Sequence, residues 1–257
     1  IYGYNLVTGE EFQITTDINE QVLPAIHGDI VVWTDLRNWN PDIYGYNLVT
    51  GEEFQITTDI TSQVEPAIYG NIVVWTDLRN GNADIYGYDI STRQEFQITS
   101  NTNDQVTPSI YEDIVIFVDV EGETVNIIGY TLSTRKEFQV AGNRHILWPP
   151  AIYGDFVVWD DLRNENWDIY GYSLSTREEI QLTSNVNDQW SPALYGNVVV
   201  WTDFRNGNAD VYGCTIAQVE KQEENSDGGI CVGSSLMCIV FLVAFLHIQE
   251  KSQRQSE

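Results

Sequence analysis

The chain alternates apolar and polar residues over short segments, and these segments return at a fixed spacing. The motif IYGY begins at Ile1 and Ile43, and its position recurs every 42 residues, at Ile85, Ile127, Ile169 and Val211. Alternation with a period of two, in segments rich in Val, Ile, Tyr, Phe and Trp, is typical of β-strands that place one face in a core. The pattern therefore predicts a repeat built from strands.

One repeat contains four such segments, for example 66–70, 71–77, 84–90 and 95–99. Short turns join the first strand to the second and the third to the fourth, and a longer polar loop, 77–84, joins the second to the third. Four short antiparallel strands in about 40 to 45 residues is the spacing of a β-propeller blade, whereas solenoid repeats of this length are mainly helical. Because the repeats contain no amphipathic helix pattern, the sequence predicts an all-β propeller.

Aromatic residues recur at one position of every second strand, and a large apolar residue recurs in every fourth strand. A single blade cannot bury both of its faces, so we expect these side chains to pack between neighbouring blades. The second-strand positions are Trp33, Trp75, Phe117, Trp159 and Trp201, and the fourth-strand positions are Phe12, Phe54, Phe96, Phe138 and Ile180.

The repeats extend over residues 1–216, and they do not divide evenly into blades. Residues 1–15 supply only a third and a fourth strand, and residues 211–216 supply a surplus third strand. A five-bladed ring closes if residues 1–15 complete the blade that begins at Pro192, which would remove the exposed sheet edges. If the chain begins further upstream, six or seven blades remain possible.

The repeat pattern P-A-I-x-G-x-x-V-V-W-x-D-x-R-N-x-N-x-D-I-Y-x-Y-x-L resembles the TolB-type propeller repeats common in surface proteins of methanogenic archaea. The resemblance covers residues 1 to about 216. It implies a propeller displayed at the cell surface, in a family whose ligands are usually unknown. The Ser-Pro-Asp-Gly hairpin of bacterial TolB is absent from this chain, so the partners of bacterial TolB are not carried over.

Charge and cysteine content narrow the classes of partner. The chain has 38 acidic and 12 basic residues, and its formal net charge of −26 would repel nucleic acid. The three cysteines, Cys214, Cys231 and Cys238, lie at or beyond the end of the repeats, so no disulfide framework holds the blades together. Packing alone must do so.

The loop between the second and third strands carries the pattern D-x-R-N-x-N-x-D, as at Asp35 to Asp42. Its spacing is similar to that of a calcium loop, but it lacks the Gly at the sixth position and the bidentate Glu at the twelfth. We therefore expect Asp and Asn to cap the turn and Arg to pair with Asp. The sequence predicts neither a metal site nor a cofactor.

Evidence for catalysis is weak. The acidic residues recur with the repeat, whereas an active site is normally singular, and His27, His145 and His247 are isolated in the sequence. No G-x-S-x-G motif and no zinc-ligand cluster occurs. We predict no catalytic residue, although a hydrolase that uses carboxylates at the rim of the propeller remains the alternative.

Residues that break the repeat are better candidates for function, because the fold does not require them. Four tryptophans do so: Trp39 and Trp167 fall in loops between second and third strands, and Trp148 and Trp190 fall in connections between blades. These two loop types emerge on the same face of a propeller. The connection 140–150 is the most individual loop and adds Arg144 and His145.

Flat indole rings on an acidic rim suit the recognition of a glycan, a peptide or an envelope protein. The candidate binding residues are therefore Trp39, Arg144, His145, Trp148, Trp167 and Trp190. The alternative is that each tryptophan covers a blade edge, or fills the space that Val22, Val64 and Val106 occupy in other repeats.

Beyond the repeats, residues 217–229 form a polar linker, 230–248 an uncharged apolar run, and 249–257 a short polar tail. Nineteen residues extend about 28 Å as a helix, which approaches the thickness of a bilayer core. Basic residues follow the run and acidic residues precede it, so the sequence predicts a single-pass anchor with the propeller outside. The alternatives are a tail packed on the propeller and a non-native extension.

Together these observations predict a membrane-anchored, surface-displayed propeller that recognises a ligand without catalysis. The alternatives are the hydrolase described above and a purely structural component of the cell envelope.

Overall fold

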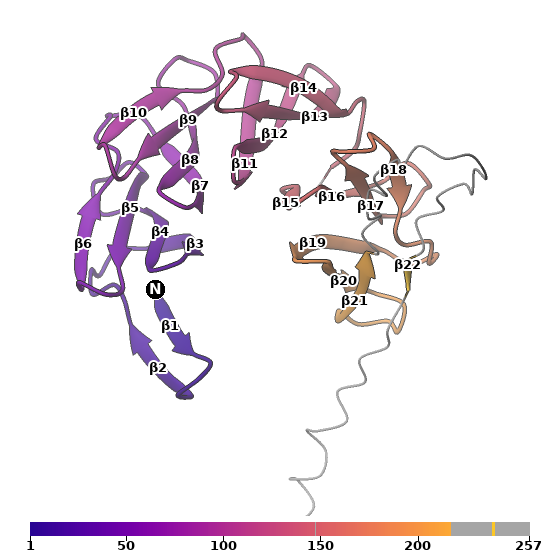
Figure 1. Ribbon diagram of the computed structural model, residues 1–257, viewed down its shortest axis with the longest axis horizontal. Helices are drawn as coiled ribbons and strands as arrows, with labels where there is room; N and C mark the ends of the chain where they lie inside the picture. Colours follow the sequence, from indigo (N-terminus) through magenta and orange to yellow (C-terminus); the bar gives the residue numbers. More distant parts are fainter. Residues whose placement is uncertain (147, 217–237, 240–257) are drawn as a thin grey trace, which may run out of the picture.

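The computed structural model describes residues 1–146, 148–216 and 238–239 (Figure 1). Within these ranges the regular secondary structure consists of β-strands alone, which confirms the all-β prediction. The strands form antiparallel sheets that stand side by side along an open arc.

Within the described ranges five sheets have four strands each, and we number them blades one to five. Blade one contains β3 (Gln21–His27), β4 (Ile30–Asp35), β5 (Asp42–Asn47) and β6 (Glu52–Gln55). Blade two contains β7 (Gln63–Tyr69), β8 (Ile72–Asp77), β9 (Asp84–Asp89) and β10 (Gln94–Gln97). Blade three contains β11 (Asp104–Tyr111), β12 (Ile114–Glu121), β13 (Thr124–Thr131) and β14 (Lys136–Ala141).

Blade four contains β15 (Ala151–Tyr153), β16 (Phe156–Asp161), β17 (Asp168–Ser173) and β18 (Glu179–Gln181). Blade five contains β19 (Gln189–Tyr195), β20 (Val198–Asp203), β21 (Asp210–Ile216) and β22 (Cys238–Ile239). A separate hairpin of β1 (Tyr2–Asn5) and β2 (Glu10–Gln13) precedes blade one. The strands of each blade pair in chain order, and the first strand of each blade lies on the inner side of the arc (Figure 1).

The apolar core lies between the blades, as the repeat predicts. Trp75 of blade two is fully buried and packs with Val32 and Ile43 of blade one. The other predicted second-strand aromatics are also buried: Trp33, Phe117, Trp159 and Trp201. Burial of one such side chain contributes about 1.5–3 kcal/mol, so these interfaces carry much of the stability.

Packing explains why the IYGY motif contains a glycine. Gly45 on β5 pairs with Phe54 on β6, and the Phe54 ring lies 2.6 Å from the position that a Cβ atom of Gly45 would take. The third strand therefore needs glycine where the fourth-strand ring crosses it. In blade four Ile180 replaces the phenylalanine, and the space above Gly171 is larger.

The inner strands are bulged and linked from blade to blade. Glu65 and Thr107 each precede a proline and adopt φ of +58° and +52°. Such a conformation costs about 1–3 kcal/mol in a non-glycine residue and needs support from its surroundings. Each N–H donates to a threonine of the preceding blade, Glu65 to Thr34 at 3.2 Å and Thr107 to Thr76 at 3.1 Å.

The arc does not close in the way that five blades would require. β21 occupies the third-strand position beside β20, so residues 1–15 do not complete the blade that begins at Pro192. β21 follows β20 after a short loop, which makes its pairing far cheaper in loop-closure entropy than that of the distant N-terminal hairpin. The number of blades in a closed ring stays a prediction.

The predicted linker 217–229, the polar tail 249–257 and most of the predicted membrane helix 230–248 lie outside the described residues. Cys238 and Ile239 of that run are described, and they form β22. Among the described residues no helix is long and apolar enough to span a membrane.

Candidate functional site

The D-x-R-N-x-N-x-D loops are internal hydrogen-bonding networks, as expected. In blade two the carboxylate of Asp77 accepts from Arg79 Nη2 at 2.6 Å and from the indole Nε1 of Trp75 at 2.9 Å. Arg79 also pairs with Glu95 at 2.6 Å and lies over the Tyr86 ring. The arginine therefore joins the second, third and fourth strands of one blade.

The asparagines of the same loop fix the turn and the next connection. Asn80 Nδ2 donates to Asp84 at 2.8 Å and to the Tyr86 hydroxyl at 3.0 Å. Asn82 Nδ2 donates to the backbone oxygen of Asn103 at 2.8 Å. The carboxylates of Asp77 and Asp84 thus have protein partners, and no group of three or more potential metal-ligating side chains is found in the described residues.

The tryptophans that break the repeat differ in exposure from those that follow it. Trp148 is 44% exposed, and Trp167 and Trp190 are half-buried. The repeat tryptophans, by contrast, are almost completely buried: Trp33, Trp75, Trp159 and Trp201. The loop and core tryptophans therefore differ in exposure, as expected.

Blade four has an irregular inner strand next to Trp148. Its first strand, β15, has three residues, whereas the equivalent β7 has seven. Residues 142–146 and 148–150 take the place of the bulged part of the strand, and this segment carries Arg144, His145 and Trp148. Because its backbone is not part of a sheet ladder, this segment can present side chains that the other blades do not.

Asp160 links the segment that carries Trp148 to the first strand of blade five. It is fully buried, and its Oδ1 accepts from the backbone N–H of Trp148 at 3.3 Å, while its Oδ2 accepts from the N–H of Ser191 at 3.2 Å. Blades one and two have Thr34 and Thr76 at this position. Sequence reasoning missed Asp160, although the replacement of Thr-Asp by Asp-Asp at the end of the second strand was a visible signal.

The backbone of Trp167 is hydrogen-bonded to the two residues that precede Trp190. The N–H of Gln189 donates to the carbonyl oxygen of Trp167 at 2.7 Å, and the N–H of Trp167 donates to Asp188 at 3.1 Å. Trp190 lies in β19 rather than in the connection before it, which corrects the prediction. Its ring contacts the edge of Phe204, with ring centroids 4.8 Å apart, and Phe204 was not predicted.

Arg144 is held by acidic residues of blade four. Its Nη2 donates to Glu179 at 2.9 Å, and its Nε lies 3.6 Å from Asp161 Oδ2. Arg163 pairs with the same two carboxylates. The buried indole N–H of Trp159 has no hydrogen-bond partner among the described residues.

The six predicted binding residues do not all meet. Arg144, His145, Trp148, Trp167 and Trp190 belong to blade four and its borders, and we call them the blade-four patch; His145 is exposed. Trp39 lies on blade one, fully exposed, and blades two and three separate it from the patch (Figure 1). Trp39 is therefore not part of the same site.

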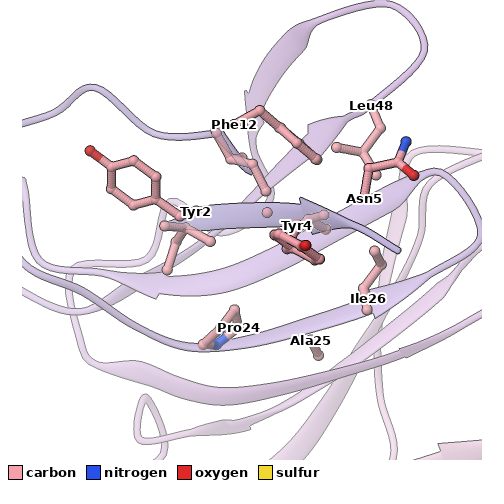
Figure 2. A pocket seen from close by; sticks show the side chains of 12 residues that line it. Tyr2, Tyr4, Asn5, Phe12, Pro24, Ala25, Ile26 and Leu48 are labelled. Atoms are coloured by element: carbon pink, nitrogen blue, oxygen red, sulfur yellow. The ribbon is translucent and has the colours of Figure 1, made fainter. Parts of the chain in front are cut away.

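A large groove lies elsewhere, between the N-terminal hairpin and blade one. Its volume is about 410 Å³, and Tyr2, Tyr4 and Phe12 line it together with Pro24 and Ile26 (Figure 2). Among the described residues β1 pairs with β2 alone, whereas the equivalent β5 also pairs with a second strand, β4. The groove lies at the end of the arc, beside the edge of β1 that has no partner strand among the described residues.

Burial and hydrogen bonding shift the pKa values of two aspartates at these loops. Burial alone would raise the pKa of Asp203, but hydrogen bonds from Arg205 and Trp201 outweigh it and hold the pKa below its ordinary value. Burial raises the pKa of Asp168, against hydrogen bonds from Asn164 and Asn166.

No protein-family model matches the chain, and no curated protein sequence matches it. Solved structures do resemble it. TolB from Acinetobacter baumannii is 19% identical with a TM-score of 0.64, over 80% of this chain and 54% of that one. A putative TolB from Agrobacterium tumefaciens is 13% identical with a TM-score of 0.62, over 82% of each chain.

An oligogalacturonate lyase from Vibrio parahaemolyticus is also similar, with 11% identity and a TM-score of 0.62 over 84% of this chain and 68% of that one. This chain spans about half the length of the A. baumannii TolB. At these identities the likeness concerns the fold alone, and the predicted archaeal surface origin stays a prediction. The chain has a TolB-like β-propeller fold.

Proposed function

We propose that this protein is a non-catalytic recognition propeller, displayed at a cell surface, that binds a glycan, a peptide or an envelope protein through the blade-four patch. One observation carries the proposal: in the blade-four patch Trp148 is exposed and Trp167 and Trp190 are only half-buried, whereas the tryptophans that follow the repeat are buried. Exposed indole rings have no packing role in the core, and rigid flat rings bind ligands at low entropy cost.

The charges around the blade-four patch restrict the class of ligand that it can bind. Glu165 and Asp188 lie on the same loops, Glu179 of β18 pairs with Arg144, and the whole chain carries a net charge of −26. An anionic ligand would be repelled, whereas a neutral sugar or a basic peptide would find hydrogen-bond acceptors beside the rings. We therefore favour a neutral or basic ligand.

The enzymatic alternative is worth considering because two similar structures are named oligogalacturonate lyases. Their name specifies an acidic sugar polymer, so a propeller of this fold accommodates a glycan. In this chain the most individual buried acid, Asp160, accepts two backbone N–H groups and supports the loops. That role favours binding over turnover.

The test compares two tryptophan variants on one glycan and peptide array, followed by calorimetry with the best ligand. The double variant Trp148→Ala and Trp190→Ala should weaken binding at least about tenfold, because aromatic anchors dominate binding energy. Trp39→Ala is the matched control, since it removes an exposed indole outside the patch, and it should bind as the wild type does. The melting temperature should change little in either variant.

Three outcomes would contradict the proposal. If the double variant bound as tightly as the wild type, the blade-four patch would not be the binding site. Early unfolding of the double variant would mean that the rings serve packing. Turnover of a bound glycan that is lost on changing a single acid would replace binding by catalysis.

A further inference from the structure

The fourth strand of blade five is short. In blade two, β10 runs beside β9 over four residue pairs, whereas β22 contributes two pairs, Thr215 with Ile239 and Ile216 with Cys238. The described part of β21 therefore leaves an open edge over Val211 to Cys214. An open edge of this kind accepts a further strand.

The edge includes a glycine whose usual partner is not among the described residues. Gly45, Gly87 and Gly129 pair with Phe54, Phe96 and Phe138, and each ring fills the position that a Cβ atom would take. Gly213 holds the same position on β21, opposite Val200 of β20. The glycine is thus retained where the described residues place no fourth-strand ring.

The register of β22 supplies that ring. β21 and β22 are antiparallel, so each step back along β21 from Thr215 is one step forward from Ile239. Continuing the pairing places Phe241 opposite Gly213 and Val243 opposite Val211. In blade two the same positions hold Phe96 opposite Gly87, followed by Ile98, whose N–H donates to the carbonyl oxygen of Ile85.

We propose that residues 238–243, CIVFLV, dock on the open edge of β21 as the fourth strand of blade five. The segment is uncharged, β-branched and aromatic, as a strand in an apolar environment requires. The outer face of blade five is correspondingly bare: Val211 is 80% exposed, whereas Ile43 and Ile85 at the same position are fully buried. Phe241 and Val243 would shield part of this face.

The proposal competes with the predicted membrane anchor, because the segment cannot form a spanning helix and a strand of blade five at once. The two residue pairs of β22 favour the strand, because a spanning helix would not pair with β21. Insertion into a membrane is therefore a contrary outcome of the tests.

One position departs from the repeat and provides a test. In blades one and two the arginine of the loop pairs with a fourth-strand glutamate, Arg37 with Glu53 and Arg79 with Glu95, each at 2.6 Å. In blade five the equivalent of these glutamates is Val240, while Arg205 pairs with Asp203. A carboxylate introduced at Val240 should therefore gain an arginine partner.

The first test is cross-linking in the full chain with Cys231 and Cys238 changed to Ser. Val240→Cys should form a disulfide with the native Cys214 under mild oxidation, because facing residues on antiparallel strands are within disulfide range. Ile239→Cys is the matched control, since its partner is Thr215 on the other face of the sheet. Peptide mapping should find the cross-link in most of the first variant and in little of the second.

Equal cross-linking of the two variants, or none in either, would overturn the proposal. The second test is Val240→Glu, which should raise the melting temperature by about 1–4 °C through an ion pair with Arg205. The gain should disappear when Arg205→Ala is added. No gain, together with recovery of the unchanged chain in membranes, would instead identify the segment as an anchor.

Discussion

The phenyl ring of Phe96 occupies the position that a Cβ atom of Gly87 would take, with the Phe96 Cζ atom 2.6 Å from it. Gly87→Ala should therefore destabilise blade two by about 1–3 kcal/mol, as overpacking does in a close-packed core. Gly171→Ala is the control, because a Cβ atom there meets Leu182 at an ordinary 3.4 Å. Denaturant unfolding should place the control within about 1 kcal/mol of the wild type, and equal losses would contradict the ring-over-glycine explanation.

Trp75 and Trp39 provide a second contrast. Trp75 is fully buried between blades one and two, and Trp39 is fully exposed. Trp75→Ala should cost about 3–5 kcal/mol through lost burial and the cavity left behind. Trp39→Ala should stay within about 0.5 kcal/mol of the wild type. Chemical denaturation of both variants measures this, and a mild effect at Trp75 would argue against blade-to-blade packing as the main source of stability.

Asp160 should control the order of the segment that carries Trp148. Asp160→Ala removes the acceptor of two backbone N–H groups, so the amides of Trp148 and Ser191 should exchange hydrogen faster. Asp160→Thr, which restores the residue of blades one and two, keeps one acceptor and should protect one amide better than the other. Hydrogen exchange followed by mass spectrometry measures both, and unchanged protection in Asp160→Ala would remove Asp160 from this supporting role.

The lowered pKa of Asp203 predicts a dependence of stability on pH. A folded pKa below the unfolded value stabilises the protein above the unfolded pKa of about 3.9, and this contribution is lost as the pH falls through the folded pKa. The free energy of unfolding should thus be higher for the wild type than for Asp203→Asn, by a roughly constant amount between pH 5 and 7. This difference should shrink below about pH 4. A difference that does not change with pH would show that Asp203 acts without its charge.

The repeat made most of the fold predictable. A spacing of 42 residues, alternation and the aromatic positions identify blades and their interfaces, because each blade must pack on copies of itself. The repeat could not show which strands pair at the two ends of the arc. That pairing depends on the length of the connecting loops, which the repeat pattern does not weigh. β21 therefore took the position that residues 1–15 were expected to fill.

The candidate site was predictable only in part. Departures from the repeat identified Trp148, Trp167 and Trp190, and the shared face follows from the up-and-down order of strands. Trp39 was grouped with them because its loop emerges on the same face, although the order of the repeats places it on blade one. Asp160 was missed although Asp-Asp replaces Thr-Asp there, because its function lies in contacts with two backbone N–H groups from other parts of the chain, which that replacement alone does not reveal.

The open hairpin at the start of the chain also bears on how the protein folds. Residues 1–18 and 43–60 are identical, yet Tyr44 is 7% exposed beside β4 while its copy Tyr2 is 64% exposed. Side-chain chemistry therefore cannot tell the folding chain which copy belongs beside β4, and the short connection to β5 decides it. Lengthening that connection should increase the population of a topological isomer in which the first copy pairs with β4, a slow-refolding species that differs from the native state only in which identical segment is buried.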